Sequence, residues 1–293
     1  MNKKILILGA NGLLGNTLLL YFLNKNYNVM GVVKNKNKFI LNSRYYYCSG
    51  NIISKENFNL KKLNFIINKL KPDFVINSIG LTKIKNFKKK IFLKINGELV
   101  KKLNLMAQKN KFKLIHFSTD CVYDGAIGHY TERHKVNAKD NYGLSKIKGE
   151  VKSKNTIIFR TSMIGHSNIK NNGLLEWFLN QKKSIKGFFK MFFSGPTALE
   201  LAKIIENFTI KRPIISNGLY NLGCHKISKY SLLKKIAKIY SKKIIIKKDI
   251  TVNLDRSLNI KKFIRKTNYK IPSWNNLIQE QKIFYEKNKK KFI

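Results

Sequence analysis

The sequence predicts an α/β fold, a Rossmann-type doubly wound parallel sheet with a smaller C-terminal lobe. Two observations support this prediction. Short apolar runs alternate with helical stretches, which is typical of a parallel sheet covered by helices on both faces. The first run, residues 3–8, leads into three glycines spaced three apart, Gly9, Gly12 and Gly15, and a helical stretch follows directly. Glycines at this spacing between a first strand and a first helix are typical of a turn that binds a dinucleotide pyrophosphate.

The alternation continues through the first half of the chain. We expect strands at residues 3–8, 28–33, 45–47, 74–79, 113–118 and 156–161, with helices at 13–24, 58–70, 87–110 and 141–154. Residues 1–165 are therefore expected to form a dinucleotide-binding domain. Beyond them the pattern loosens, but residues 218–222 are expected to return to the sheet as a further strand and residues 243–248 to form another strand. Residues 166–293 should form mainly a substrate-binding lobe, with a cleft at the carboxyl ends of the strands.

The glycine turn predicts a dinucleotide cofactor, and we expect NADPH or NADH. Glycine permits positive φ and a close approach of backbone amides to phosphate, which then sits at the positive end of the helix. The residues expected at the pyrophosphate are those of the turn itself: Gly9, Asn11, Gly12, Leu13, Leu14 and Gly15. The glycines and asparagines also interrupt the uncharged stretch from residue 5 to 23, so we expect a buried strand, turn and helix there and no membrane span.

The end of the second strand favours NADPH. A carboxylate at this place hydrogen-bonds the ribose hydroxyl of NAD, but the sequence has no acid between residues 29 and 39. It has Lys34 at the strand end instead, and an ammonium can pair with the 2′-phosphate of NADPH. Asn51 and Ile52, after the third strand, are expected to flank the adenine.

Tyr142 and Lys146 are the candidate catalytic pair. They are four residues apart, so a helix places them on one face. An ammonium nearby stabilises a phenolate and lowers the pKa of a tyrosine, which can then exchange a proton with a carbonyl or alcohol oxygen. Thr119, at the end of the fifth strand, can hydrogen-bond the same oxygen. The segment of residues 160–165, after the sixth strand, is expected at the same edge.

Composition bounds the alternatives. The net charge is +44, with 59 Lys and Arg against 15 Asp and Glu, but the lysines are spread along the whole chain beside many Asn and Ile. This spread is typical of compositional drift and a solvated surface, so we do not expect nucleic acid as a partner. The three cysteines and five histidines have no metal-ligand spacing and no disulfide framework, so we expect no metal and a cytoplasmic protein.

The motifs together resemble the extended short-chain dehydrogenase/reductase superfamily and, within it, the dTDP-4-dehydrorhamnose reductase-like sugar-nucleotide reductases. The resemblance spans nearly the whole chain. Besides the glycine turn it rests on four segments: Ser118-Thr119-Asp120 with Val122-Tyr123-Asp124-Gly125, Tyr130-Thr131-Glu132, Tyr142-Gly143-x-Ser145-Lys146-x-x-Gly149-Glu150, and Arg160-Thr161-Ser162. Residues 218–221 resemble the strand that returns to the sheet.

The resemblance implies roles for individual residues. Tyr142 is the acid, Lys146 is its partner and the ligand of the nicotinamide ribose, and Thr119 is the third catalytic member. Ser78, Ile79 and Gly80 are implied at the cofactor, Asn96 as a structural support or a solvent-facing helix residue, and Asp120, Cys121, Met163 and Arg256 at the substrate. Cys121 and Met163 depart from the Tyr and Trp usual in the family, so the sugar can differ from dehydrorhamnose.

The expected reaction is reduction of a nucleotide-linked 4-keto-deoxysugar in the biosynthesis of a surface polysaccharide such as O-antigen. The protein is expected to form a homodimer. Dehydration is disfavoured, since related dehydratases carry Glu where this chain has Cys121. Two alternatives stay open: epimerisation, which needs only the Tyr142 and Lys146 pair, and a non-catalytic subunit that binds the nucleotide sugar or the cofactor.

Overall fold

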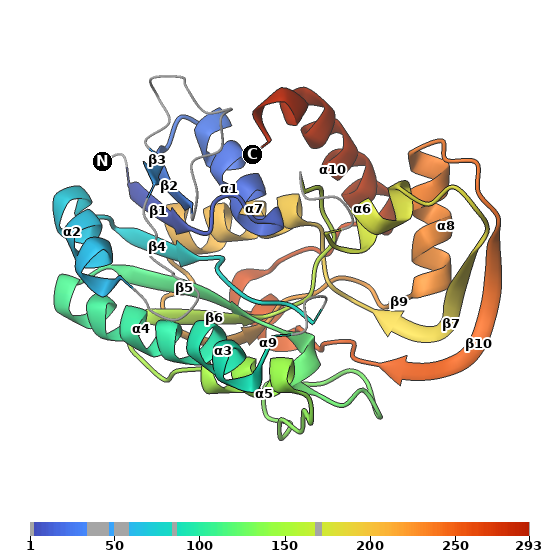
Figure 1. Cartoon of the computed structure of the whole chain (residues 1–293), viewed down its shortest axis with the longest axis horizontal. Coiled ribbons are helices and arrows are strands. Elements are labelled where there is room, and N and C mark those ends of the chain that lie inside the picture. The colour runs from blue at the N-terminus through green and yellow to red at the C-terminus, as the bar shows by residue number, and fades with distance from the viewer. Residues whose placement is uncertain (1–2, 34–46, 50–58, 84–86, 168–171, 293) are drawn as a thin grey trace.

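The central sheet is parallel throughout and doubly wound. The computed structural model describes residues 3–33, 47–49, 59–83, 87–167 and 172–292, and within them seven strands pair in the order β3-β2-β1-β4-β5-β6-β8 (Figure 1). The strands are β1 Lys4–Leu8, β2 Asn28–Val33, β3 Tyr47–Ser49, β4 Phe74–Asn77, β5 Lys113–Ser118, β6 Thr156–Arg160 and β8 Gly218–Asn221. The order reverses between β1 and β4, and such a switch point is where open α/β sheets bind their ligands.

Helices cover both faces of the sheet because the strand side chains alternate between two apolar cores. Ile5 and Ile7 pack with residues of α1 (Leu13–Asn24) and α7 (Ala198–Ile205), whereas Leu6 and Leu8 pack with α2 (Leu60–Leu70) and α4 (Leu99–Asn110). Figure 1 shows these two pairs of helices on opposite sides of the sheet. The remaining helical segments are α3 Lys89–Phe92, η1 Leu93–Glu98, η2 Asp120–Val122, α5 Asn141–Lys148, α6 Leu174–Leu179, η3 Glu206–Lys211, α8 Lys229–Ile239, α9 Lys261–Thr267, α10 Trp274–Asn288 and η4 Lys289–Lys291.

The C-terminal part of the chain contains a second, smaller sheet. Its strands are ordered β10-β7-β9, with β10 (Ile246–Asp255) parallel to β7 (Ile185–Phe193) and β9 (Ile227–Ser228) antiparallel to it. A third apolar core, which includes Phe178, Phe193 and Trp274, lies between this sheet and its helices. The Rossmann-type fold with a smaller lobe is thus confirmed, while the division at residue 165 stays a prediction.

Several predicted elements have different bounds; the strand expected at residues 45–47, for example, is Tyr47–Ser49. The strand expected at residues 243–248 runs from Ile246 to Asp255 and has a bulge between Asp249 and Asn253. The helix expected to reach residue 154 ends at Lys148, with Gly149 as its C-cap. A Cβ on Gly149 would lie 2.3 Å from the carbonyl oxygen of Asn96, so only glycine lets the two segments pass this closely. The helix expected at residues 87–110 contains a π-helical turn, Leu93–Glu98.

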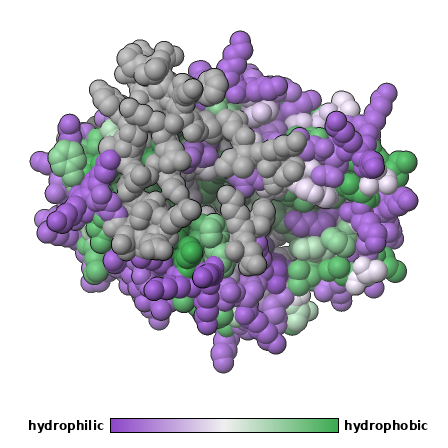
Figure 2. Space-filling model, in the orientation of Figure 1, coloured by the Kyte–Doolittle hydropathy of each residue, from purple (hydrophilic) through white to green (hydrophobic). Residues whose placement is uncertain are grey.

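Polar side chains are spread over the surface rather than gathered in one place. On the face in Figure 2, hydrophilic residues cover most of the described surface and apolar residues appear in small separate groups. Among the helices in the described part of the chain, none has both the length and the apolar character that a bilayer crossing requires.

Candidate active site

The glycine turn after β1 has the geometry that the sequence predicts. Gly9 has a φ of 79°, and its backbone N–H donates to the carbonyl oxygen of Val32 at 2.9 Å, which fixes the turn at the carboxyl edge of the sheet. A Cβ on Gly15 would lie 2.2 Å from the oxygen of Gly9, so only glycine permits the first turn of α1 to pack this closely. The helix begins after Gly12 with no side-chain cap, which leaves its N-terminal amides at the turn.

The other residues of the turn differ in what they can offer a ligand. Asn11 is partly exposed beside the turn. Leu14 belongs to the apolar core on the α1 side of the sheet, so only its backbone is available. The side chain of Leu13 contacts the chain at Gly165 and Gly173, where added Cβ atoms would lie 2.9 and 3.0 Å from its methyl groups. Leu13 therefore connects the turn with the segment that follows β6.

Ser78, Ile79 and Gly80 follow β4 and run from the glycine turn toward Lys146. The Ser78 hydroxyl donates to the carbonyl oxygen of Leu8 at 2.6 Å, and Ile79 packs against Gly9. Gly80 is exposed, and a Cβ there would lie 3.0 Å from the Nζ of Lys146. This predicted cofactor segment thus lies between the turn and Lys146, the predicted catalytic lysine.

Lys146 and Tyr142 come from α5, whose N-terminus is capped by Asp140 through a bond from the Gly143 N–H at 2.8 Å. The Lys146 side chain is buried, and its Nζ donates to the carbonyl oxygen of Phe117 at 3.0 Å. Burial lowers the pKa of Lys146 to about 8. The lysine is therefore held against the end of β5 with its charge near its titration point.

Tyr142 faces Thr119 across the end of β5. A hydrogen bond with Thr119 acts to lower the pKa of Tyr142, but burial outweighs it and the net direction is upward. The expectation of a lowered pKa for this tyrosine is therefore wrong for the protein alone, because burial desolvates the phenolate more than the neighbouring groups stabilise it. The consequence is a hydroxyl that keeps its proton at neutral pH, the form that a general acid needs.

Asn96 supports this arrangement from the π-helical turn. Its Oδ1 accepts from the Leu81 N–H at 2.9 Å, and its Nδ2 donates to the Ser145 hydroxyl at 3.0 Å. That hydroxyl in turn donates to the carbonyl oxygen of Tyr142 at 2.7 Å. Asn96 is buried, so it is not the solvent-facing residue that the sequence also allowed. It connects the segment after Gly80 to the helix that carries the catalytic pair.

Asp120, Cys121 and Arg256 lie together beside Thr119. Asp120 accepts from the Thr119 hydroxyl at 3.1 Å and from the Ser162 hydroxyl at 2.8 Å. The Nη1 of Arg256 lies 3.8 Å from the Sγ of Cys121, and burial raises the pKa of that thiol to about 12. Met163 is partly buried and packs against the core on the α1 side. Asp120, Cys121 and Arg256 thus lie together after the end of β5, whereas Met163 packs against the core on the α1 side.

Two residues of the recognised motifs are structural instead. Arg160 is buried and forms an ion pair with Glu150, with Nε to Oε1 at 2.8 Å, and it also donates to the Tyr123 hydroxyl at 2.6 Å. Glu150 also accepts from the Ser118 hydroxyl at 2.6 Å. This network joins β5, β6 and the end of α5, and so fixes the strand ends that carry the site.

Lys229 lies near the candidate site, and the sequence does not predict it there. It begins α8, and its Nζ lies 4.1 Å from the ring centroid of Phe193. Burial lowers its pKa to about 8, while the nearby Asp120 and Cys121 favour its charged form. The Ser228 cap of α8 places Lys229 at a helix start, but among so many lysines nothing in the sequence distinguishes it. Lys34, Asn51 and Ile52 lie outside the described residues.

The comparisons with known proteins agree with this geometry. The family model described as RmlD substrate binding domain matches residues 3–280. The fold is similar to the dTDP-4-dehydrorhamnose reductase of Bacillus anthracis, solved in complex with NADP, with a TM-score of 0.77 and 20% identity over 97% of this chain and 98% of that one. No curated protein sequence matches this chain.

Of two further similar structures, one has the same activity and the other has a different one. A dTDP-4-dehydrorhamnose reductase from Clostridium acetobutylicum has a TM-score of 0.76 and 21% identity, over 97% of this chain and 99% of that one. The UDP-Glc/GlcNAc 4-epimerase of Campylobacter jejuni has a TM-score of 0.74 and 11% identity, over 97% and 99%. At these identities the structures establish the fold, and the reaction has to be argued from the site.

Proposed function

The chain belongs to the RmlD substrate binding domain family, and on that premise we propose that it is an NADPH-dependent reductase of a nucleotide-linked 4-keto-deoxysugar. The observation that carries the proposal is the meeting of three side chains at the end of β5. Tyr142 is a half-buried acid that keeps its proton, Thr119 interacts with it, and the Nζ of Lys146 lies at Gly80, at the end of the segment that runs from the glycine turn. An unreactive binding subunit would have no need of this combination.

The residues present fit a nicotinamide dinucleotide. The positive φ of Gly9 and the close packing of Gly15 leave the amides at the start of α1 free of side-chain cover, as a pyrophosphate requires. Lys146 uses one N–H on the oxygen of Phe117, and an ammonium has two more for a ribose diol. When bound, the cofactor supplies a hydride.

Tyr142 and Thr119 act on the substrate oxygen. Tyr142 donates its phenolic proton to the ketone oxygen as the carbonyl carbon is reduced, so that the product is an alcohol, and solvent returns the proton to the tyrosine. Thr119 hydrogen-bonds the same oxygen and orients it. Lys146 stabilises the phenolate left behind, and it does so best while the lysine is charged.

The substrate side is formed by Asp120, Cys121, Met163 and Arg256, with the small sheet of the C-terminal lobe behind them. The fork of Arg256 matches a diphosphate, because a guanidinium binds two phosphate oxygens at once. Cys121 leaves no carboxylate to act as base in a dehydration. The product is proposed to serve the synthesis of a surface polysaccharide. The division into a cofactor domain, residues 1–165, and a substrate lobe, residues 166–293, is part of this proposal.

The test is product analysis by NMR with nucleotide-linked 4-keto-deoxysugars and NADPH, together with the absorbance of the reduced nicotinamide. A reductase consumes one NADPH for each sugar alcohol formed. Interconversion of two nucleotide sugars without net consumption of NADPH would instead identify an epimerase. Binding of substrate and cofactor with no product from any of them would identify a non-catalytic subunit.

A further inference from the structure

A strongly basic pocket lies at the β8 edge of the central sheet, beside α9. Its volume is about 830 Å³. Five cationic side chains line it, and together they are called the basic pocket here: Arg133, Lys261, Lys262, Arg265 and Lys266. None of the groups assigned to cofactor or substrate lines it, so it is separate from the site around Tyr142.

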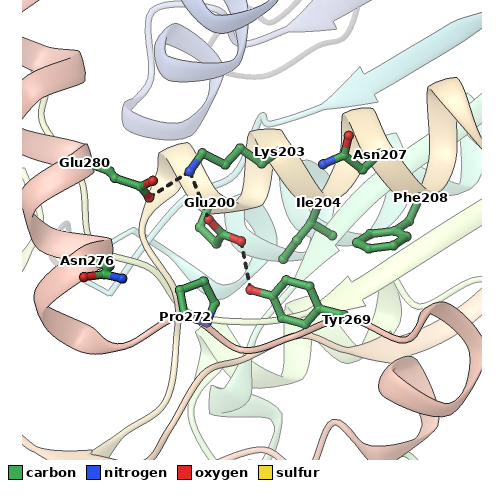
Figure 3. Close-up of a pocket in the computed structure, with 9 residues that line it drawn as sticks. All are labelled: Glu200, Lys203, Ile204, Asn207, Phe208, Tyr269, Pro272, Asn276 and Glu280. Carbon is green, nitrogen blue, oxygen red and sulfur yellow. Dashed lines mark hydrogen bonds and ion pairs between the residues drawn. The ribbon is translucent and has the colours of Figure 1, made fainter.

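One acid lines the basic pocket, Glu132, and its carboxylate already accepts a hydrogen bond from the protein backbone. Its Oε1 accepts from the backbone N–H of Asn221 on β8 at 2.8 Å. A smaller pocket of about 220 Å³, between α7 and α10, shows the opposite situation (Figure 3). There Lys203 lies 2.7 Å from Glu280 and 3.6 Å from Glu200, so the cation is neutralised by the chain itself. The basic pocket has no such balance among the side chains that line it.

Two of the lysines are held in place at the wall of the pocket. The Nζ of Lys262 donates to the carbonyl oxygen of Leu219 at 2.6 Å and lies 4.4 Å from the ring centroid of Tyr220. The Nζ of Lys266 donates to the hydroxyl of Tyr220 at 3.2 Å. These contacts use one N–H of each ammonium and leave the positive charge at the pocket.

The spacing of the basic residues along α9 places positive charges next to one another. Lys261 and Arg265 are four residues apart, and so are Lys262 and Lys266, so each pair shares a helix face. Like charges at this spacing destabilise a helix. A bound anion would relieve both repulsions at once.

The arginines argue against compositional drift as the whole explanation. The excess of basic residues is mostly lysine, and only six of the 59 are arginine. Two of those six, Arg133 and Arg265, line this pocket. A guanidinium binds two oxygens of a phosphate in a fixed fork, which a lysine does not.

We propose that the basic pocket binds a small anion that carries two or more phosphate groups. The volume lies within the range of sites for small ligands, and the five cations around it match several phosphate charges rather than one. This inference does not depend on the proposed reductase activity.

The test is a calorimetric titration of the full-length protein with inorganic tripolyphosphate, with excess NADP present to occupy the glycine turn. The double variant Arg133→Gln/Arg265→Gln should bind at least about tenfold more weakly than the wild type, since one charge-assisted hydrogen bond is worth about a factor of ten. Arg265→Lys keeps the charge but loses the fork, and should fall between the two. Circular dichroism checks that each variant is folded.

The matched control is Lys287→Gln/Lys290→Gln, which removes the same charge from exposed positions near the C-terminus. Its affinity for tripolyphosphate should equal that of the wild type. Equal weakening in the pocket and control variants, or no binding by the wild type, would overturn the proposal. A single-stranded oligonucleotide that binds more tightly than tripolyphosphate, with the same dependence on Arg133 and Arg265, would also overturn it by identifying a nucleic acid as the ligand.

Discussion

The Nζ of Lys146 lies 3.0 Å from the carbonyl oxygen of Phe117, the residue before the last one of β5. This contact holds a buried ammonium against the carboxyl end of the sheet, with Gly80 close on its other side. Burial lowers the pKa of Lys146 to about 8, and Glu150 opposes that shift without cancelling it. Lys146, the proposed ligand of the cofactor ribose, therefore gains or loses its positive charge near pH 8.

The affinity for NADPH should fall as the pH rises through about 8. Below the pKa of Lys146 the side chain is an ammonium, with a charge and three N–H donors; above it the charge is lost and one donor with it. Affinity measured by fluorescence titration across this range should show one titration step. Lys146→Met should bind more weakly at low pH and lose the step.

Lys148→Met is the matched control, because Lys148 is exposed on the same helix. It should leave the titration step in place. A step of the same size in Lys146→Met would show that another group titrates, and the role of Lys146 as a cofactor ligand would be wrong.

Tyr142→Phe should reduce turnover by about 10²–10⁴-fold, the contribution typical of a positioned general acid. The phenylalanine keeps the ring that packs edge-to-face against Phe92, with centroids 6.4 Å apart, so the fold and the affinity for NADPH should stay unchanged. Rate and affinity are measured separately, by steady-state kinetics and by fluorescence titration. Turnover near that of the wild type would remove Tyr142 from the mechanism.

Cys121 should react slowly with alkylating reagents in the folded protein. Burial raises the pKa of its thiol to about 12, so near pH 8 only about one thiol in ten thousand is a reactive thiolate. Timed alkylation followed by mass spectrometry of peptides should show labelling far slower than in the denatured chain. Once attached, the label should inhibit, because Arg256 lies against the sulfur. Rapid labelling, or full activity after labelling, would place Cys121 outside the substrate site.

The sequence predicts the fold well because local signals and the sheet agree. Glycine spacing, strand length and the alternation of apolar residues each depend on a few neighbouring residues, and β1, α1 and β2 lie where those signals place them. The predicted bounds are wrong where no local pattern marks them. The end of α5 at Lys148 and the π-helical turn at Leu93–Glu98 are two such places. The close approach of Gly149 to Asn96, more than fifty residues earlier, is likewise not contained in any local pattern.

The site is predictable to the extent that its motifs are contiguous. Thr119, Tyr142 and Lys146 belong to such motifs, and the structure brings them together. The sequence predicts the wrong direction for the pKa shift of Tyr142, because desolvation depends on everything packed around the ring. The sequence does not predict Lys229 for the same reason: it interacts electrostatically with Asp120 and Cys121, which are far away in the sequence.

Lys34 should determine the preference for NADPH over NADH. It follows the last residue of β2, and a charge-assisted contact with the 2′-phosphate is worth about 1.5–3 kcal/mol, or roughly ten- to hundredfold in selectivity. The measurement is kcat/KM for both cofactors in the wild type and in Lys34→Ala. A wild type that prefers NADH, or a variant with unchanged selectivity, would contradict this assignment.

Lys229→Met should raise the KM for the nucleotide sugar and leave the affinity for NADPH unchanged. The ammonium is half-buried over the ring of Phe193 and interacts electrostatically with Asp120, where the proposed substrate residues gather. A partly desolvated cation there favours an anionic part of the substrate, and losing one charge-assisted contact should raise KM by roughly ten- to hundredfold. Methionine keeps the length of the side chain, so packing on Phe193 is preserved.

Lys238→Met is the control for this variant. Lys238 is exposed at the other end of α8, so its substitution removes the same charge from the same helix. It should leave KM unchanged. The pKa of Lys229, lowered to about 8, adds a second readout, because KM should rise with pH through that value in the wild type and not in Lys229→Met. If both variants behave alike, the charge acts at long range and Lys229 does not touch the substrate. If only Lys229→Met loses the pH step, the ammonium at the start of α8 is part of the substrate site.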